Sequence, residues 1–259
     1  MANLKVCLPG CKATSQRALV FASIAQGART IFGLSRGDDT QELLQALIGL
    51  GVKVNFDDNG AVSIEGCDGD LPNRIASLSC GKGGTTFRFL TALCGTQPGQ
   101  YRLHADDQLW ERPHEPLWRA LRGLGVAIER EGNDLLIDSL SYCPNLVDLD
   151  SSFSSQFLSS LFLVDTSREL FSDDFLNSQS STYFLYSKDC VDSWKKSNRI
   201  EIPGDFSASL YFLAWSLFSK QLVEFYPEIS LAHPESYALD YLKENFGIDM
   251  RNNTFIPKG

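Results

Sequence analysis

The residues best suited to chemistry in this sequence follow a Pro-Gly turn near the N-terminus. Lys12 and Arg17 lie five residues apart at the start of a predicted helix, directly after Pro9-Gly10. The first turn of a helix presents unpaired backbone N–H groups and the positive end of the helix dipole. Two cations beside such a turn are typical of an anion-binding site. The alternative for this stretch alone is a turn with two solvated basic residues.

A glycine-rich turn, SCGKGGTTFR, repeats the same arrangement farther along the chain. It enters a predicted helix at Gly84 and Thr85 and carries the cations Lys82 and Arg88. Glycines allow backbone N–H groups to approach a ligand closely, so the turn indicates a phosphate or carboxylate site. The alternative is a turn with a purely structural role.

A run of hydroxyl side chains, SSFSSQF, begins a third predicted helix. Ser154 and Ser155 can donate to phosphate oxygens, and Gln156 can bridge to a second ligand. Buried hydroxyls need polar partners, which a bound anion would supply, although an N-cap cluster is an equal alternative. Ser187-Lys188 again combines a hydroxyl with a cation.

The sequence offers no catalytic residue and no metal site that can be assigned from spacing. His104, His114 and His233 are isolated, and no Ser-His-Asp or Cys-His pattern is recognisable. The seven cysteines are scattered without a CxxC pair, which argues against zinc and favours reduced thiols. We therefore expect no zinc site.

Composition and charge restrict the class of protein. The 259 residues are 43% hydrophobic and 21% charged, as in an ordinary globular protein, and the net charge is −9. Such a charge argues against nucleic acid as a partner, whereas converging cations can still bind a small anion. No apolar run is long enough to span a membrane, and the N-terminus lacks a signal-peptide pattern. We expect a cytoplasmic protein that binds small phosphorylated molecules.

The alternation of apolar and polar residues predicts a mixed α/β (α+β) fold built from repeats. Two segments, 46–66 and 120–140, match in phase as helix, Leu-Gly-Val, strand, polar turn and strand, and 241–259 resembles them. Gly27 and Gly51 are expected to end helices, and 165–183 is expected to form a loop or lid. The expected strands are 4–8, 28–34, 52–56, 61–65, 100–105, 126–130, 134–138, 146–149 and 221–226, and the expected helices are 14–26, 42–50 (capped by 38–40), 85–94, 115–124, 154–164, 189–196 and 206–218.

These elements make four βαβαββ-like units, without a GxGxxG or P-loop phosphate cradle. Each polar cluster begins a helix in one unit. If the units pack around one axis, the helix starts and their cations converge on one ligand.

Five motifs, in matching order and spacing, resemble those of the 5-enolpyruvylshikimate-3-phosphate synthase family. LPGCKATSQRAL (8–19) resembles LPGSKSxSNRAL, and GKGGTTFRFLTAL (81–93) resembles NAGTAxRFLTAL. ERPHEPLWRALRGLG (111–125) is similar to ERPIxxLxxALxxLG. SSFSSQFLSSL (151–161) is similar to GSVSSQFLxAL, and GDFSASLYFLA (204–214) to GDxSSAxYFLA.

The resemblance implies the enolpyruvyl transferase fold, an inverse α/β barrel-like arrangement of two domains with three units each. About four of the six units would be present. Residues 8–198 would form the shikimate-phosphate-side domain, and 199–259 with 1–7 the first unit of a truncated second domain. The implied reaction transfers an enolpyruvyl group from phosphoenolpyruvate to shikimate 3-phosphate, in aromatic amino acid biosynthesis, without a cofactor.

The resemblance also implies roles for individual residues. Lys12 matches a residue that contacts both substrates, and Arg17 one that binds shikimate phosphate. Gln156 matches a residue between the substrates. The remaining matches are Ser154, Ser155 and Ser187 at phosphate or hydroxyl groups, and Gly84 and Thr85 at the phosphoenolpyruvate-side turn, while Lys82, Arg88 and Lys188 are weaker candidates.

Several positions depart from the family pattern. Ala13 replaces a Ser or Thr, Lys82 an Asn, Gly83 an Ala, Gln108 an Arg and Cys190 a Tyr. The segments that carry the family's acid/base residues are not matched either, and catalysis of this kind depends on cations that meet developing charge. We therefore expect this chain to be incomplete for catalysis.

Two alternatives remain open. The chain could be a non-catalytic binding or regulatory homologue that keeps the anion cleft, or a transferase with another acceptor, such as a UDP-sugar. Residues 199–259 alone would bury little apolar surface, so we expect them to pack on the first domain, on a second copy or on another chain.

Overall fold

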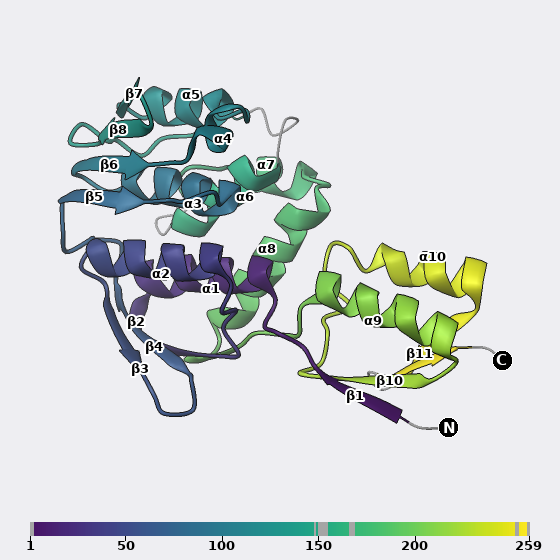
Figure 1. Cartoon of the computed structure of the whole chain (residues 1–259). Coiled ribbons are helices and arrows are strands. Elements are labelled where there is room, and N and C mark those ends of the chain that lie inside the picture. Colours follow the sequence, from purple (N-terminus) through teal and green to yellow (C-terminus); the bar gives the residue numbers. More distant parts are fainter. Residues whose placement is uncertain (1–2, 148, 150–154, 166–168, 252–253, 258–259) are drawn as a thin grey trace.

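Three four-stranded sheets and the helices that cover them make up the protein (Figure 1). The computed structural model describes residues 3–147, 149, 155–165, 169–251 and 254–257. Within these ranges, no helix is long and apolar enough to cross a membrane.

The first sheet is formed mainly by an early segment of the chain and is joined by a strand from much later. Its order is β3-β4-β2-β9, antiparallel except for the parallel pair β2–β9. One helix precedes β2 and another follows it. The elements are α1 (Lys12–Ile24), β2 (Gln26–Phe32), α2 (Asp38–Gly49), β3 (Lys53–Phe56), β4 (Val62–Cys67) and β9 (Arg199–Glu201).

The second sheet repeats this pattern with the order β5-β6-β8-β7. Its edge pair β5–β6 is parallel and the other two pairs are antiparallel. Its elements are β5 (Ile75–Ser79), α3 (Gly84–Gly95), β6 (Gln100–His104), α4 (Asp107–Trp110), α5 (Glu115–Gly123), β7 (Ala127–Glu131) and β8 (Asp134–Asp138).

Three helices follow, α6 (Ser155–Val164), α7 (Asp173–Ser178) and α8 (Thr182–Trp194). Two of them, α6 and α8, form the centre of the larger hydrophobic core with α1 and α3, whereas α7 has no buried residue. Helix α1 contacts α2, α3, α6, α8 and β4, so all its residues from Thr14 to Ile24 are buried. This packing holds the first turns of α1, α3 and α6 near one another.

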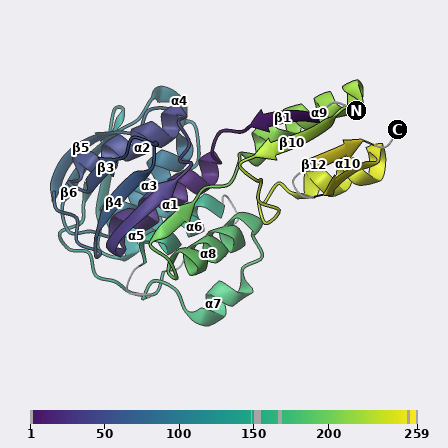
Figure 2. The same ribbon diagram turned by 90° about the horizontal axis from the view of Figure 1, so that it is seen from below.

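The third sheet brings together the two ends of the chain. Its order is β1-β10-β12-β11, and β1 lies parallel to β10. With α9 and α10 it surrounds a second, smaller hydrophobic cluster, set apart from the rest (Figure 2). The elements are β1 (Asn3–Cys7), α9 (Phe206–Ser219), β10 (Leu222–Tyr226), α10 (Tyr237–Phe246), β11 (Ile248–Arg251) and β12 (Thr254–Pro257).

One face of α9 has no partner among the described residues. Tyr211, Trp215 and Phe218 are 79%, 40% and 89% exposed at helical spacing. Exposed aromatic residues in such a row are typical of an interaction surface.

Most predicted elements are present with shifted ends, but two predicted boundaries are wrong. Gly27 does not end a helix, because α1 already stops at Ile24, where Ala25 turns extended, and Gly27 pairs with Gly66 inside the sheet. Helix α2 is capped by Gly37, so Asp38 and Asp39 lie in its first turn, where carboxylates favour the helix dipole.

Other elements differ because the local signal is weak. The edge strand β5 and the short helix α4 were not predicted; β5 buries only Leu78. The predicted loop 165–183 contains α7, and α8 begins at Thr182 rather than at 189. The predicted strand 146–149 is not formed by its described residues, and residue 148 lies outside them.

Candidate functional site

Five helices begin around one cavity of about 590 Å³. They are α1, α3, α6, α8 and α9, so the positive ends of five helix dipoles are directed toward the same space. This arrangement suits an anionic ligand. The cavity is lined by Cys11, Lys12, Ala13, Gln16, Arg17, Thr85, Ser155, Gln156, Tyr183, Asp205, Ser207, His233 and Glu235.

Arg17 is the strongest sign of an anion site. Its side chain is only 2% exposed, and its Nε donates to Ser187 Oγ (2.7 Å) and its Nη1 to the carbonyl of Ala13 (2.9 Å). No carboxylate of the described residues forms an ion pair with it. Burial lowers the pKa of Arg17, because the charged form is deprived of water. A buried guanidinium without a carboxylate is stabilised when an anion binds.

Ser187 holds the Arg17 side chain in position by accepting its Nε hydrogen bond. It is fully buried on α8, donates to the carbonyl of Tyr183 (2.8 Å) and contacts Ser159 Oγ (3.2 Å). Its hydroxyl oxygen therefore faces the Arg17 Nε with a fixed orientation. Ser187 does not line the cavity itself.

Lys12 is held at the mouth of the cavity by two acidic residues. Its ammonium forms an ion pair with Asp39, and its backbone N–H donates to Asp205 Oδ2 (3.2 Å). Asp205 also caps α9, since its Oδ1 accepts from the N–H of Ala208. The pair with Asp39 is half-exposed, so a ligand anion can compete for the ammonium.

A second group of cations surrounds the first turn of α3. Arg88 Nη1 donates to Gln156 Oε1 (2.5 Å), and burial, followed by the charge of Arg112, lowers the pKa of Arg88. A Cβ placed on Gly84 would lie 2.6 Å from Arg112 Nη1, so only glycine leaves this guanidinium in place. Thr85 follows and lines the cavity.

Sequence reasoning did not single out Arg112, which follows Glu111 in the ERP motif. Both residues are exposed, and no ion pair joins them in the described part of the chain. Arg112 lies in the turn between α4 and α5, and its position beside Gly84 of α3 follows only from the fold.

A loop that follows β10 supplies a wall that the sequence did not reveal. Glu235 accepts from Tyr183 OH (3.0 Å) and from Ser207 Oγ (2.6 Å), which links α8 to α9 across the cavity. Burial and the bond to Glu235 raise the pKa of Tyr183 to about 12. His233 stacks on Phe206 with ring centroids 5.4 Å apart, and burial lowers its pKa.

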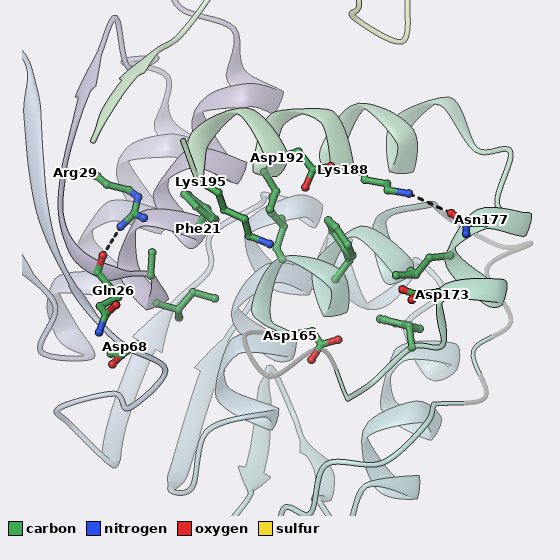
Figure 3. Close-up of a pocket in the computed structure, with 17 residues that line it drawn as sticks. Phe21, Gln26, Arg29, Asp68, Asp165, Asp173, Asn177, Lys188, Asp192 and Lys195 are labelled. Carbon is green, nitrogen blue, oxygen red and sulfur yellow. Dashed lines mark hydrogen bonds between the residues drawn. The ribbon is translucent and has the colours of Figure 1, made fainter. Parts of the chain in front are cut away.

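Among the predicted site residues that the structure describes, the cavity lining does not include Gly84, Arg88, Ser187, Lys82 or Lys188; the first three contact its lining or lie beside it in sequence, and the last two do not. Ser154 lies outside the described residues, whereas its neighbour Ser155 lines the cavity. Lys82 is exposed and does not line it. Lys188 points to a different cavity, where its Nζ donates to Asn177 Oδ1 (3.4 Å; Figure 3).

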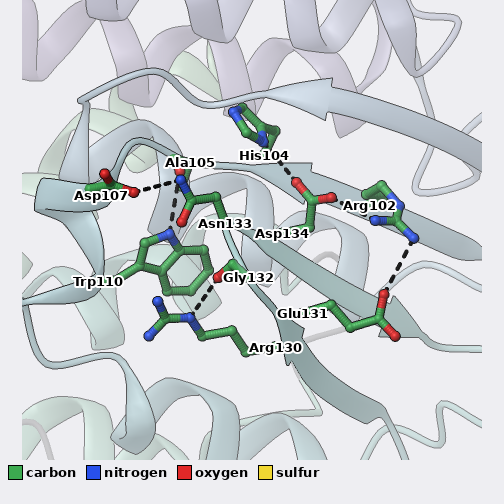
Figure 4. A network of polar contacts seen from close by, with 10 residues as sticks. All are labelled: Arg102, His104, Ala105, Asp107, Trp110, Arg130, Glu131, Gly132, Asn133 and Asp134. Carbon is green, nitrogen blue, oxygen red and sulfur yellow. Dashed lines mark hydrogen bonds and ion pairs between the residues drawn. The ribbon is translucent and has the colours of Figure 1, made fainter.

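A polar network around His104 and Asp134 also lies outside the lining of this cavity, and its role is structural. His104 Nδ1 lies 2.7 Å from Asp134 Oδ1, and Arg102 and Glu131 extend the network along one face of the second sheet (Figure 4). The bonds from His104 and Arg102 lower the pKa of Asp134. No hydroxyl or thiol of the described residues is hydrogen-bonded to His104, so the network has no nucleophile.

The cysteines and acidic groups do not build a metal centre within the described ranges. All seven cysteines are free. Cys11 and Cys190 lie near Arg17, and burial raises their pKa values, for Cys190 to about 11, so both are neutral thiols at pH 7.

Comparison with known proteins identifies the family. Residues 2–169 match the model of EPSP synthase (3-phosphoshikimate 1-carboxyvinyltransferase). The chain is 33% identical to the 3-phosphoshikimate 1-carboxyvinyltransferase of Laribacter hongkongensis over 236 residues, 81% of this chain and 55% of the relative. It is 33% identical to that of Nitrosomonas europaea over 80% of this chain and 54% of the relative. The chain thus spans about half the length of these curated relatives.

Solved structures agree on the fold. Two structures of EPSP synthase from Acinetobacter baumannii superpose with TM-scores of 0.75 and 0.77, over 98% of this chain. They are 20% and 21% identical to it, and 63% and 64% of their own length is covered. This mixed α/β chain belongs to the EPSP synthase family.

Proposed function

We propose that this protein transfers an enolpyruvyl group from phosphoenolpyruvate to the 5-hydroxyl of shikimate 3-phosphate, with release of inorganic phosphate. Residues 1–259 provide the part that binds shikimate 3-phosphate. The observation that carries the proposal is the buried Arg17 guanidinium, without a carboxylate partner in the described structure, where five helices begin.

The roles of the lining residues follow from their chemistry and from the family motifs. Arg17 and Ser155 bind the anionic and hydroxyl groups of shikimate 3-phosphate, and Ser187 orients Arg17. Lys12 lies where both substrates meet, which its place at the cavity mouth supports. Gln156 separates the two substrates while it binds Arg88.

The phosphoenolpyruvate side is the turn that opens α3. Gly84 and Thr85 present backbone N–H groups, and Arg88 and Arg112 add positive charge beside them. Gln108 is exposed on α4, where the family pattern has an arginine. A neutral amide cannot replace a guanidinium in a bidentate contact, so we expect weak affinity for phosphoenolpyruvate.

The division of the fold into repeat units and domains is also part of the proposal. We propose that the chain carries four of the six βαβαββ units of an enolpyruvyl transferase, with 8–198 as one domain and 199–259 plus 1–7 as the start of a second. The separate hydrophobic clusters on either side of the cavity support this division. The third unit contributes α6 to α8, and its strand β9 joins the sheet of the first unit.

The proposal predicts that residues 1–259 alone bind shikimate 3-phosphate but do not convert it. They cover about half of the relatives' length, so the proposal assigns the family's acid/base residues to the part of the relatives that they do not cover. Isothermal titration with shikimate 3-phosphate and a coupled phosphate-release assay test both parts. Absence of binding would contradict the proposal, and turnover by this chain alone would contradict its incompleteness.

A non-catalytic binding protein is the second candidate, and Gln108 favours it. This neutral amide is exposed on α4 where the family pattern has an arginine, so the shikimate 3-phosphate side can bind its ligand while the phosphoenolpyruvate side lacks this cation. Adding the C-terminal part of the Laribacter hongkongensis relative distinguishes the two. Recovery of phosphate release identifies a transferase half, whereas binding without recovery supports the binding protein. The phosphate-release assay with a UDP-sugar in place of shikimate 3-phosphate tests the third candidate, a transferase with another acceptor.

A further inference from the structure

A second cavity, of about 430 Å³, lies at the opposite ends of the helices that begin at the first (Figure 3). Helices α1, α6 and α8 line the first cavity with their first turns and the second with their last turns, and α7 closes one side. The two cavities share none of their lining residues. The proposed function therefore leaves the second cavity unused.

The inner wall of this cavity is apolar and largely aromatic. Phe21 comes from α1, Phe162 from α6, Leu176 from α7 and Val191 from α8, and Phe171 precedes α7. An apolar wall that is open to solvent gains free energy when a ligand covers it.

Arg29 on β2 lines the same cavity and has an unused hydrogen-bond donor. It is 9% exposed, its guanidinium lies over the Phe21 ring at 5.0 Å, and its Nη1 donates to the carbonyl of Gln26 (2.7 Å). Its Nε is buried out of reach of solvent, whereas Nη2 is not enclosed and has no hydrogen bond to any described residue. Nη2 is therefore the atom through which the guanidinium can donate a charge-assisted hydrogen bond to a carboxylate.

The charges at the rim restrict the ligand further. Asp68, Asp165, Asp173 and Asp192 line the cavity together with Lys188 and Lys195. The last turns of three helices add the negative ends of their dipoles. Four carboxylates therefore face three cations, so repulsion of a phosphate dianion or a dicarboxylate is about twice that of a monoanion paired with Arg29.

We infer that the second cavity is a binding site for a small monocarboxylate with an aromatic or branched apolar body. The carboxylate accepts a hydrogen bond from Nη2 of Arg29, and the apolar body lies against Phe21, Phe162 and Val191. The inference is independent of the proposed transferase function, because its site and its ligand are separate.

Titration of the 259-residue chain with 3-phenylpropionate tests the inference. We expect saturable binding that saturating shikimate 3-phosphate changes by less than about twofold. Arg29→Gln removes the charge-assisted hydrogen bond and is expected to weaken binding roughly 10- to 150-fold. Arg199→Gln is the matched control, because Arg199 lies on the neighbouring strand β9, pairs with Glu201 and stacks on Phe32 outside the cavity.

A second variant covers the case in which Arg29→Gln does not fold. Leu176→Trp fills the apolar side of the cavity from α7, leaves Arg29 in place and is expected to abolish binding. Loss of affinity in the cavity variants, with affinity kept in Arg199→Gln, supports the site. Absence of binding to the unchanged chain overturns the inference, as does unchanged affinity in Arg29→Gln. Competition by shikimate 3-phosphate, or tighter binding of 2-phenylethylamine than of 3-phenylpropionate, overturns it as well.

Discussion

Replacement of Arg17 by methionine should abolish ligand binding while leaving the stability of the chain nearly unchanged. Arg17 is buried with its charge and has no carboxylate partner in the described structure. We expect the Arg17→Met chain to be about as stable as the unchanged chain and to have lost its affinity for shikimate 3-phosphate. A structural ion pair would behave differently, since breaking a buried pair costs about 3–5 kcal/mol.

The magnitude follows from the contacts of the side chain. Arg17 makes two hydrogen bonds, each worth about 1.5–3 kcal/mol because the donor is charged. Removing the charge also removes its desolvation cost, which is several kcal/mol for a buried ion. Neither acceptor is left unpaired, because Ser187 keeps its bonds to Tyr183 and Ser159, and the Ala13 carbonyl lies within α1. The two effects nearly cancel, so the free energy of unfolding should change by less than about 2 kcal/mol.

Urea unfolding followed by far-UV circular dichroism measures this difference, with and without shikimate 3-phosphate. A ligand at 100 times its Kd should stabilise the unchanged chain by about 2.7 kcal/mol and the Arg17→Met chain by almost nothing. Ser187→Ala is the control, because it keeps the charge but removes one partner, and it should cost about 1–3 kcal/mol. A loss above roughly 4 kcal/mol in Arg17→Met, or full stabilisation by the ligand, would refute the reasoning.

Substitutions elsewhere test a close backbone contact, a buried histidine and the exposed face of α9. Gly10→Ala would press its Cβ into the Gly33 carbonyl and should destabilise by about 1–3 kcal/mol, whereas Gly123→Ala meets open space and should stabilise by about 0.4–1 kcal/mol, both in urea unfolding. Burial lowers the pKa of His233 below 6.5, so the unfolded chain takes up its proton first. Stability should therefore be complete above about pH 6.5 and fall as the pH drops toward the lowered pKa, and His233→Phe should flatten that fall in unfolding curves between pH 7.5 and 5. Phe218→Glu should weaken concentration-dependent association in sedimentation velocity, and an identical profile for both chains would exclude α9 as the contact.

Sequence pattern predicted the elements whose signal is local and strong. Helix α2 and the hairpin of β3 and β4 follow from regular leucines and from the Asp-Asp-Asn-Gly turn. Strand β5 was not predicted because an edge strand with one buried residue shows no clear alternation of apolar and polar side chains. Gly27 was misinterpreted because a glycine with positive φ fits a helix end and a strand crossing equally well.

The candidate site was predictable only in part for a related reason. Lys12, Arg17 and Gln156 are marked by helix-start patterns, and the convergence of those helices was inferred from the repeat. Glu235 and His233 carry no local pattern, because their roles arise from contacts with Tyr183 and Phe206 that span tens of residues. Arg29 looks like an ordinary strand residue, and only the fold shows that its side chain is buried without an ion pair to any carboxylate of the described residues.

The parallel pairing of β1 with β10 has a consequence for synthesis on the ribosome. Asn3–Cys7 emerges first, yet its partner Leu222–Tyr226 is translated after more than two hundred further residues. At about 5–20 residues per second, β1 waits on the order of 10–40 seconds with its edge unpaired. During that time the first two sheets can fold without it, while the nascent strand remains available to chaperones or to the wrong partner. An affinity tag fused before β1 would lie beside the third sheet, so its cost would appear as slow maturation of the elements from α9 to β12 rather than as a defect confined to β1.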